Sequence, residues 1–297
     1  MGIAKGNTMT QSATQHSGET LRNISDTALS TAVIRARESE RSDALFRDPF
    51  AARLAGERGQ RIAAANPAQQ KMSWALVMRT YLYDQFINEQ LTEGVDLVIN
   101  LAAGLDTRPF RMSLPASLRW VEVDLPGIID YKDEILRNEK PKCVLERVRL
   151  DLSDVSGRRA LFARVGQQGR KILVVAEGLL IYFTPADVGV FARDLAGVPS
   201  FQRWIIDLVS PGLLRMMQKE AAPQLAAAGA AFQFGPAEGP NFFVPYGWKP
   251  VDVRSPLKTA ARFHRLRGFM RFAALLPESH GAQGGRPWSG MCLLAKI

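Results

Sequence analysis

The chain has 297 residues, of which 46% are hydrophobic and 23% are charged, and its formal net charge is +9. These values are ordinary for a globular protein, and the length suits one large domain or one domain with a cap. The sequence contains no run of about eighteen uncharged apolar residues and no recognisable N-terminal signal sequence. We therefore expect a cytoplasmic protein that has no membrane partner.

The two cysteines and three histidines do not form a recognisable site. Cys143 and Cys292 lie far apart in apolar segments, and the histidines lack the spacing of metal ligands. The arginines are scattered and often lie next to acids, as in "IRARESERSDALFRD". We interpret this pattern as solvated helix faces. The sequence therefore predicts no metal and no nucleic-acid partner, although the net charge leaves an RNA-binding protein as an alternative.

The first part of the chain has no strand pattern. Residues 1–24 are rich in Ser, Thr, Gln and Gly, and we predict that they form a disordered tail. A helix is expected from Asp26, followed by a break at "RDPF", a short helix and a long helical segment over 69–93. We therefore predict an N-terminal helical cap over residues 25–94.

From residue 95 onward, apolar runs alternate with helical stretches such as "LPGIIDYKDEILRNE" and "TPADVGVFARDLAG". This alternation is typical of βαβ units and predicts an α/β fold over 95–297, with a doubly wound, mostly parallel, seven-stranded sheet. The stretch 210–246 is rich in Gly, Pro and Ala without clear periodicity, so we expect an inserted lid there, and a helix near 256–276. The expected strands are 95–100, 119–124, 146–151, 171–178, 203–209, 248–255 and 289–297.

Ligands of such sheets bind beyond the carboxyl ends of the strands. In "VINLAAGLDTR", Gly104 lets the backbone turn tightly against a ligand, and the following helix offers free N–H groups. Asp124, at the end of the second strand, is placed to accept hydrogen bonds from both hydroxyls of a ribose. These features indicate a nucleoside-containing cofactor.

The glycine content of the first loop favours one of two cofactors. A dinucleotide such as NAD prefers Gly-x-Gly-x-x-Gly, because its pyrophosphate approaches the backbone at several points. Here the loop has one glycine, and Asp106 would repel a pyrophosphate. S-adenosylmethionine carries an ammonium, a sulfonium and one carboxylate, so it suits this loop better. An NAD-dependent oxidoreductase is the alternative from another functional class.

Several motifs occur together in this chain: "TALSTAVIRARESERSDALFRDPFA", "MRTYLYDQF", "NLAAGLDTRPFR", "VEVDLP", "VRLDLSD" and "VAEGLLIYF". In order and spacing they resemble the leucine carboxyl methyltransferase family, from about Thr27 to Gly247. They look closest to its bacterial branch of polyketide and other small-molecule O-methyltransferases. The resemblance implies a class I methyltransferase with a Rossmann-like fold, which uses S-adenosylmethionine and releases S-adenosylhomocysteine.

The resemblance also implies cofactor-binding roles for individual residues. Arg79 matches the arginine that binds the cofactor carboxylate, and Glu177 matches the acid that faces its amino group. Gly104 matches the glycine of the first loop. Asp124, followed by Leu125, matches the ribose-binding acid. On the residues alone, Arg79 could instead be a surface side chain, whereas an acid directly after a buried strand, such as Glu177, already favours a site.

Asp151 and Leu152 match the pair beside the adenine, with the carboxylate on the exocyclic amine and the leucine over the ring. Tyr182 lies in a stretch that faces the substrate, and it is the candidate catalytic residue. Asp124 and Asp151 could instead only cap the helices that follow them. The family has Gly-Ala-Gly where this chain has "AAG", so Ala102 replaces a glycine. If this position has a positive φ, the alanine costs about 1 kcal/mol.

Methyl transfer from a sulfonium is an in-line displacement that mainly requires alignment of the reacting groups. A carboxylate acceptor is ionised near neutral pH and needs no general base. This fits a sequence with no Ser-His-Asp order, so we expect a methyl ester of an anionic small-molecule acceptor. A phenol or enol acceptor is the alternative, and His264 is then the plausible base. The sequence leaves the identity of the acceptor and the oligomeric state open.

Overall fold

A seven-stranded sheet forms the centre of the computed structural model, which describes residues 26–65, 70–226, 231–278 and 284–297. The strand order is β3-β2-β1-β4-β5-β7-β6. Strands β1 to β5 are parallel to one another, and β7 is antiparallel to both β5 and β6. The seven expected strands are confirmed, and the expected tail lies outside the described residues. The strands are β1 (Leu97–Leu101), β2 (Arg119–Asp124), β3 (Val144–Arg149), β4 (Ile172–Ala176), β5 (Phe201–Val209), β6 (Trp248–Arg254) and β7 (Ser289–Lys296).

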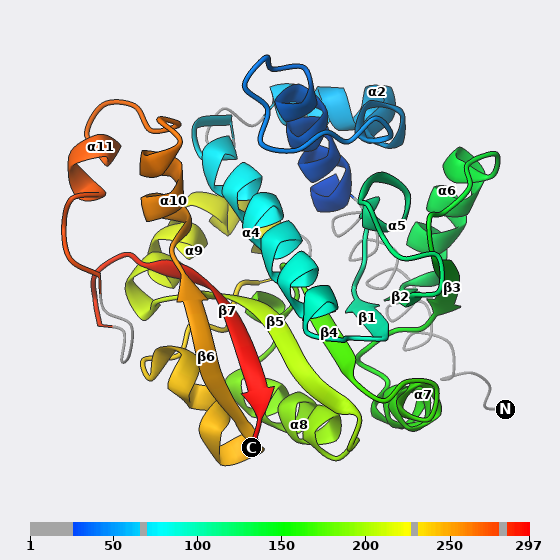
Figure 1. Ribbon diagram of the computed structural model, residues 1–297. Helices are drawn as coiled ribbons and strands as arrows, with labels where there is room; N and C mark the ends of the chain where they lie inside the picture. The colour runs from blue at the N-terminus through cyan, green and yellow to red at the C-terminus, as the bar shows by residue number, and fades with distance from the viewer. Residues whose placement is uncertain (1–25, 66–69, 227–230, 279–283) are drawn as a thin grey trace, which may run out of the picture.

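Helices cover both faces of the sheet, as expected for a doubly wound fold (Figure 1). The α-helices are α2 (Ala51–Ala64), α4 (Ser73–Thr92), α5 (Arg108–Arg111), α6 (Pro126–Leu136), α7 (Val155–Gly166), α8 (Pro185–Ala196), α9 (Pro211–Ala226), α10 (Pro256–Arg262) and α11 (Met270–Ala273). Residues 26–39 are also helical, and two 3-10 helices are η1 (Leu180–Tyr182) and η2 (Gly239–Tyr246). Within the described ranges, no helix has both the length and the apolar character needed to cross a lipid bilayer.

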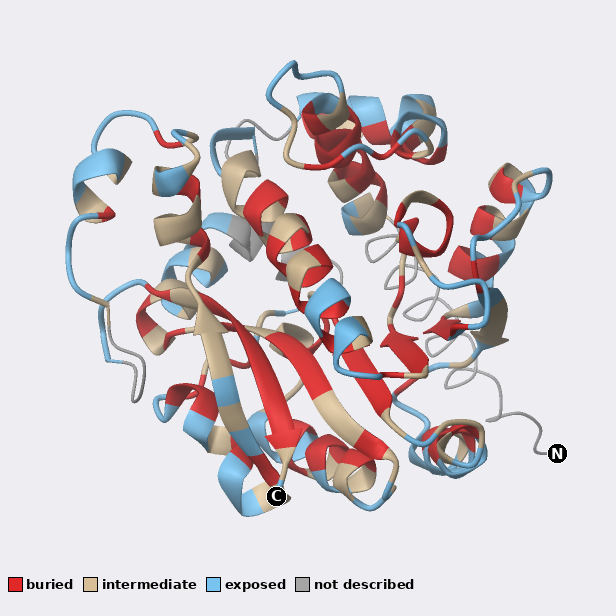
Figure 2. Cartoon of the chain, in the orientation of Figure 1, coloured by how far each residue is buried: buried red, intermediate tan, exposed pale blue. Residues whose placement is uncertain are grey.

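The central strands are buried on both sides. In β1 every residue is buried; Leu97 and Ile99 pack on the side of α7 and α8, whereas Val98 packs with Phe86 of α4 on the other side. Successive side chains of a strand point to opposite faces, so a strand covered on both faces needs the continuous apolar run seen in the sequence. Figure 2 shows this burial along the middle of the sheet.

Three segments differ from, or are not settled against, the expectations from the sequence. The stretch 210–246, expected to be irregular, contains α9 and η2. The helix expected near 256–276 is divided into α10 and α11, because His264 and Gly268 have positive φ values of 55° and 54° that a right-handed helix does not accommodate. The division into a cap and an α/β domain stays a prediction; α4, which falls within the expected cap, packs directly on the sheet.

The first prediction concerns the stability that the hydrophobic core gives to the fold. Trp204 on β5 is fully buried, and its ring contacts those of Phe191, Phe243 and Trp248. Trp204→Ala should lower the free energy of unfolding by about 3–5 kcal/mol, because it leaves a cavity between the sheet and its helices. Urea titration followed by circular dichroism measures this loss. The exposed Val144 is the control site, where Val144→Ala should cost less than about 0.5 kcal/mol; equal losses would contradict the proposed core.

Candidate functional site

The loop after β1 and the end of β2 meet at one carboxylate. The N–H of Gly104 donates to Oδ2 of Asp124 (2.6 Å), and the N–H of Leu125 donates to Oδ1 (2.7 Å). Burial raises the pKa of Asp124 despite these two hydrogen bonds. Ala102 and Gly104 both have positive φ, 53° and 50°, so the tight turn is present and an alanine occupies a left-handed position within it.

The helix over residues 26–39 is tied to this loop. Nη2 of Arg35 donates to the carbonyl oxygen of Leu105 (2.6 Å), and its Nε donates to Oδ2 of Asp48 (2.8 Å). The same Asp48 oxygen accepts a hydrogen bond from the hydroxyl of Thr107 (2.7 Å). Asp48 belongs to the "RDPF" break, which therefore connects the first helix to the loop after β1.

Glu177, directly after β4, binds two arginines. Its Oε1 accepts a hydrogen bond from Nε of Arg79 on α4 (3.0 Å), and its Oε2 accepts one from Nη1 of Arg108 in α5 (2.9 Å). The Arg108 side chain is only 2% exposed. The structure therefore brings Arg79 and Glu177 into contact, and it adds an arginine that was not among the predicted site residues.

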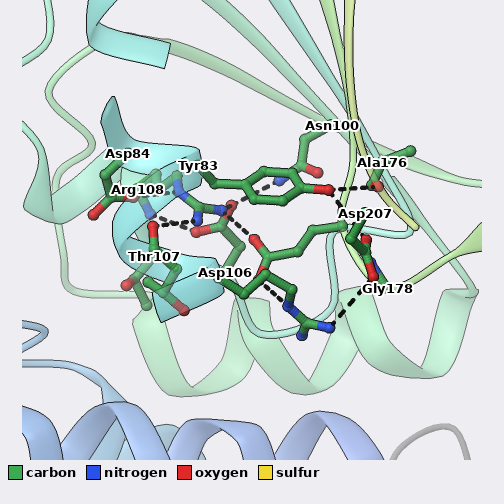
Figure 3. Close-up of polar contacts among 12 residues, drawn as sticks. Tyr83, Asp84, Asn100, Asp106, Thr107, Arg108, Ala176, Gly178 and Asp207 are labelled. Carbon is green, nitrogen blue, oxygen red and sulfur yellow. Dashed lines mark hydrogen bonds and ion pairs between the residues drawn. The ribbon is translucent and has the colours of Figure 1, made fainter. Parts of the chain in front are cut away.

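Arg108 lies at the centre of a wider set of buried charges (Figure 3). Its Nε donates to Oδ1 of Asp84 on α4 (2.6 Å), and its Nη1 also donates to Oδ2 of Asp106 (2.9 Å). Arg111 binds both oxygens of Asp84, at 2.7 and 2.8 Å. Asn100 on β1 donates to Oδ2 of Asp106 (2.7 Å). The charges are thus held in place from α4, α5 and β1.

Asp207 on β5 completes this set. Its Oδ1 accepts hydrogen bonds from the N–H of Gly178 (2.6 Å) and the hydroxyl of Tyr83 (3.1 Å), and its Oδ2 lies 3.8 Å from Nη1 of Arg79. Three guanidinium groups therefore face four carboxylates, which leaves one negative charge in excess. We refer to these residues as the charge cluster: Arg79, Asp84, Asp106, Arg108, Arg111, Glu177 and Asp207.

The guanidinium groups lower the pKa of two acids in the charge cluster, Asp106 and Glu177. Burial alone would raise the pKa of Asp106 and of Glu177. In both cases the surrounding positive charges, Arg108 foremost, outweigh burial and lower the pKa. Among the residues that the structure describes, no group of three or more His, Cys, Asp or Glu side chains could hold a metal ion.

The expected adenine-binding pair lies in the loop after β3. Asp151 is exposed and accepts a hydrogen bond from the N–H of Ser153 (2.8 Å), whereas the Leu152 side chain lies in the hydrophobic core. The cap of α7 is Asp154, which accepts from the N–H groups of two residues in that helix. The alternative in which Asp151 only caps this helix is therefore wrong, and its carboxylate remains at the surface.

Tyr182 lies in η1, near the charge cluster. Its ring is 5.5 Å from that of Phe232. Burial raises the pKa of its hydroxyl, and the positive charge of Arg79 and a hydrogen bond with Thr27 oppose that shift. The hydroxyl is therefore bound to Thr27 of the first helix and is close enough to Arg79 to be affected by its charge.

Four members of the charge cluster, Asp84, Arg108, Arg111 and Asp207, escaped the reasoning from the sequence. Asp207 lies inside β5, within "RWIIDLV", where its charge among apolar residues is the one signal in the sequence. Arg108 and Arg111 follow Asp106 in "LDTRPFR", two and five residues later, but nothing in the sequence shows that their side chains are buried. Asp84 is one of several polar residues on α4 and has no distinguishing pattern.

Comparison with known proteins finds one family model and several relatives that are named methyltransferases. The family model described as leucine carboxyl methyltransferase matches residues 28–194. A protein of Streptomyces avermitilis, provisionally named an S-adenosyl-L-methionine-dependent methyltransferase, is 31% identical over 249 residues, which cover 80% of this chain and 87% of that protein. A protein of Streptomyces coelicolor with the same provisional name is 29% identical over 273 residues, which cover 87% of this chain and 92% of that protein.

Two solved structures share the fold. A DUF574 family protein of Streptomyces avermitilis has a TM-score of 0.57 at 14% identity, covering 90% of this chain and 97% of the other. A provisionally named methyltransferase of Thermobifida fusca has a TM-score of 0.53 at 15% identity, and the match covers 83% of this chain and 92% of the other. At these identities the likeness concerns the fold alone.

The left-handed alanine makes a second prediction. Ala102→Gly should raise the free energy of unfolding by about 0.5–1 kcal/mol, because glycine removes a strain of about 1–2 kcal/mol and costs less than that in chain entropy. The neighbouring Ala103, which is buried and has no positive φ, is the matched control. Ala103→Gly should destabilise the protein in the same urea titration. Destabilisation by both variants would contradict the strain at Ala102.

The third prediction concerns pH. Asp106→Asn should lower the free energy of unfolding by about 2–4 kcal/mol at pH 7, because Arg108 loses a buried partner. Since folding lowers the pKa of Asp106, its ionised form stabilises the fold above the unfolded value of 3.8, and this stabilisation is lost as the pH falls toward the folded pKa. Urea titrations at several pH values should show the difference narrowing below about pH 4. Glu57→Gln, at a 95% exposed side chain, should show no such trend; a constant difference for Asp106→Asn would refute the ionised pair.

Proposed function

The chain belongs to the leucine carboxyl methyltransferase family, and we propose that it transfers a methyl group from S-adenosylmethionine to a carboxylate of an anionic small molecule. The chain is an S-adenosylmethionine-dependent methyltransferase. This replaces the NAD-dependent oxidoreductase that the sequence left as an alternative. The nature of the acceptor and a cytoplasmic location stay predictions.

The charge cluster carries the proposal. S-adenosylmethionine bears a positive sulfonium and a positive ammonium against one carboxylate, so it has one positive charge in excess. The cluster holds four carboxylates against three guanidinium groups. Opposite net charges attract strongly in a site that excludes water. A neutral or anionic cofactor would leave the fourth carboxylate without a balancing charge.

The ion pair between Arg79 and Glu177 is the proposed binding place for the amino-acid part of the cofactor. Arg79 lies at the edge of the cluster, with its side chain 19% exposed, and can turn from Glu177 to a ligand carboxylate. Glu177 can then accept hydrogen bonds from the ligand ammonium. Arg108 keeps its place because Asp84 and Asp106 hold it. The exchange gives both Arg79 and Glu177 a new partner of opposite charge, which matters because an unpaired buried charge is costly.

The strand ends supply the proposed contacts for the adenosine. Asp124 uses one lone pair of each oxygen for the backbone, so a second remains on each for a ribose hydroxyl. Leu125 follows it at the start of α6 and is proposed to contact the same sugar. The exposed carboxylate of Asp151 is available for the exocyclic amine. Leu152 is proposed beside the ring, with most of its side chain buried in the core below.

The acceptor is proposed to approach from the side of Tyr182 and the helix over 26–39. S-adenosylmethionine supplies an activated methyl group, so the chain has to align the acceptor and exclude water. A carboxylate arrives ionised, whereas a phenol or enol must lose a proton to a base. His264, the candidate base, is exposed after α10 and has no hydrogen-bonded contact with the charge cluster. This favours a carboxylate acceptor over the alternative.

The cofactor assignment makes a fourth prediction. Arg79→Gln should raise the Kd for S-adenosylhomocysteine by about tenfold to a hundredfold, because it removes a charged hydrogen bond to the ligand carboxylate. Methylthioadenosine lacks that carboxylate, so its Kd should not change. Asp124→Asn should weaken both ligands, because both carry the ribose. Isothermal titration calorimetry measures each value. Equal weakening of the two ligands by Arg79→Gln would rule out the proposed role of Arg79.

The acceptor chemistry makes a fifth prediction. Incubation with S-adenosylmethionine labelled on its methyl group and a panel of organic acids and phenols should label an organic acid. Methyl esters release methanol in mild alkali and aryl ethers do not, so the label should become volatile after treatment with base. His264→Ala should leave turnover and its pH profile unchanged. A label that resists alkali, together with loss of activity in His264→Ala, would establish the phenol or enol alternative instead.

A further inference from the structure

The chain exposes a group of large apolar side chains in and after α11. Phe269, Phe272, Leu275 and Leu276 are 78%, 68%, 79% and 59% exposed. We call these four residues the α11 surface, which stands at the periphery of the molecule in Figure 2. Exposed apolar side chains are ordinary when they are scattered, but a contiguous group marks a binding surface.

The α11 surface belongs to a segment that is held firmly in place. Nζ of Lys258 on α10 donates to the carbonyl oxygens of Ala274 (2.5 Å) and Leu276 (2.7 Å). On the inner side of the segment, Leu266 and Ala274 are buried in a cluster that includes Val77 of α4. The outward direction of the apolar side chains is therefore part of the fold and does not come from a frayed end.

The segment that carries the α11 surface has only positive charges as far as Pro277, after which Glu278 follows. Residues 255–277 contain five Lys and Arg and no Asp or Glu. Lys258 binds backbone carbonyls and Arg265 binds Glu38. Arg267 and Arg271 are exposed, and the guanidinium group of neither forms a hydrogen bond or an ion pair with another described residue. Free arginines beside exposed Phe and Leu are the pattern of a segment that lies in the interface of an anionic membrane.

The α11 surface is also connected to the proposed methyl-transfer site. Arg265 donates to Oε1 of Glu38 (3.1 Å), on the helix that covers the loop after β1. α10 packs on the first half of α4, which also carries Arg79, and α11 lies beyond α10 at the periphery (Figure 1). A partner bound to the α11 surface would therefore lie close to the elements that surround the acceptor side of the proposed methyl-transfer site.

We propose that the α11 surface binds a lipid surface with anionic headgroups, so that the protein associates with a membrane without spanning it. The four apolar side chains enter the acyl region, and Arg267 and Arg271 meet the headgroups. A second copy of the chain is a poorer occupant, because a two-fold contact would bring these cations together. The absence of a long apolar run led us to expect no membrane partner, but such a run is needed only for a spanning helix.

Co-sedimentation of the full chain with phosphatidylcholine vesicles, with and without phosphatidylglycerol, tests this proposal. We expect binding to the anionic vesicles, weakened by salt. Phe269→Ser with Phe272→Ser should lower the partition coefficient by about tenfold or more. The matched control is Val144→Ser with Val251→Ser, at side chains that are 57% and 50% exposed on the edge strands β3 and β6, and it should bind as the wild type does.

A second pair of variants separates a local effect from the net charge. Arg267→Gln with Arg271→Gln should weaken vesicle binding by about tenfold, whereas Arg159→Gln with Arg170→Gln, which removes the same charge from another exposed region, should have little effect. Equal effects of the two pairs, or no binding to anionic vesicles, would overturn the proposal. So would a dimer seen by light scattering that the Phe269 and Phe272 changes dissociate, because it would make a second copy the occupant. Since vesicle binding is measured without cofactor or acceptor, the result does not depend on the proposed reaction.

Discussion

The contact of the Glu177 carboxylate, whose side chain is 16% exposed, with two arginines is the interaction on which the rest of the site depends. Arg108 is almost fully buried, and burying its charge would be costly without Asp84, Asp106 and Glu177 around it. These partners come from α4, from the loop after β1 and from the end of β4. The charge cluster therefore fixes the position of three elements that are distant in the sequence, and it keeps one arginine, Arg79, at the edge where it can change partner.

The loop after β1 is held from two sides. Below it, Asp124 accepts the N–H of Gly104; above it, Arg35 and Thr107 share the carboxylate of Asp48. These bonds explain how the chain keeps a left-handed alanine in this loop: the surrounding structure determines its conformation and offsets a modest strain. They also link the first helix to the proposed cofactor site, so the walls on the acceptor side and the cofactor loop form one connected structure.

Much of the fold was predictable because its signals are local. Each apolar run from "VDLVIN" to "SGMCLLAKI" became a strand, and the single glycine at Gly104 marked a real turn. Arg79 and Glu177 were singled out together, yet their contact could be predicted only through a family resemblance, because they lie on different elements. Arg108 and Asp207 were missed because their burial results from tertiary packing. α9 was missed because its Gly, Pro and Ala content resembles that of a loop.

The central claim is that the ion pair between Arg79 and Glu177 opens to receive the amino-acid part of the cofactor. A crystal structure of the protein with S-adenosylhomocysteine tests it most directly. We expect the ligand ammonium beside Glu177, the ligand carboxylate on Arg79, and Arg108 still bound to Asp84 and Asp106. A bound ligand with the pair between Arg79 and Glu177 intact, or a ligand whose ribose lies away from Asp124, would contradict it.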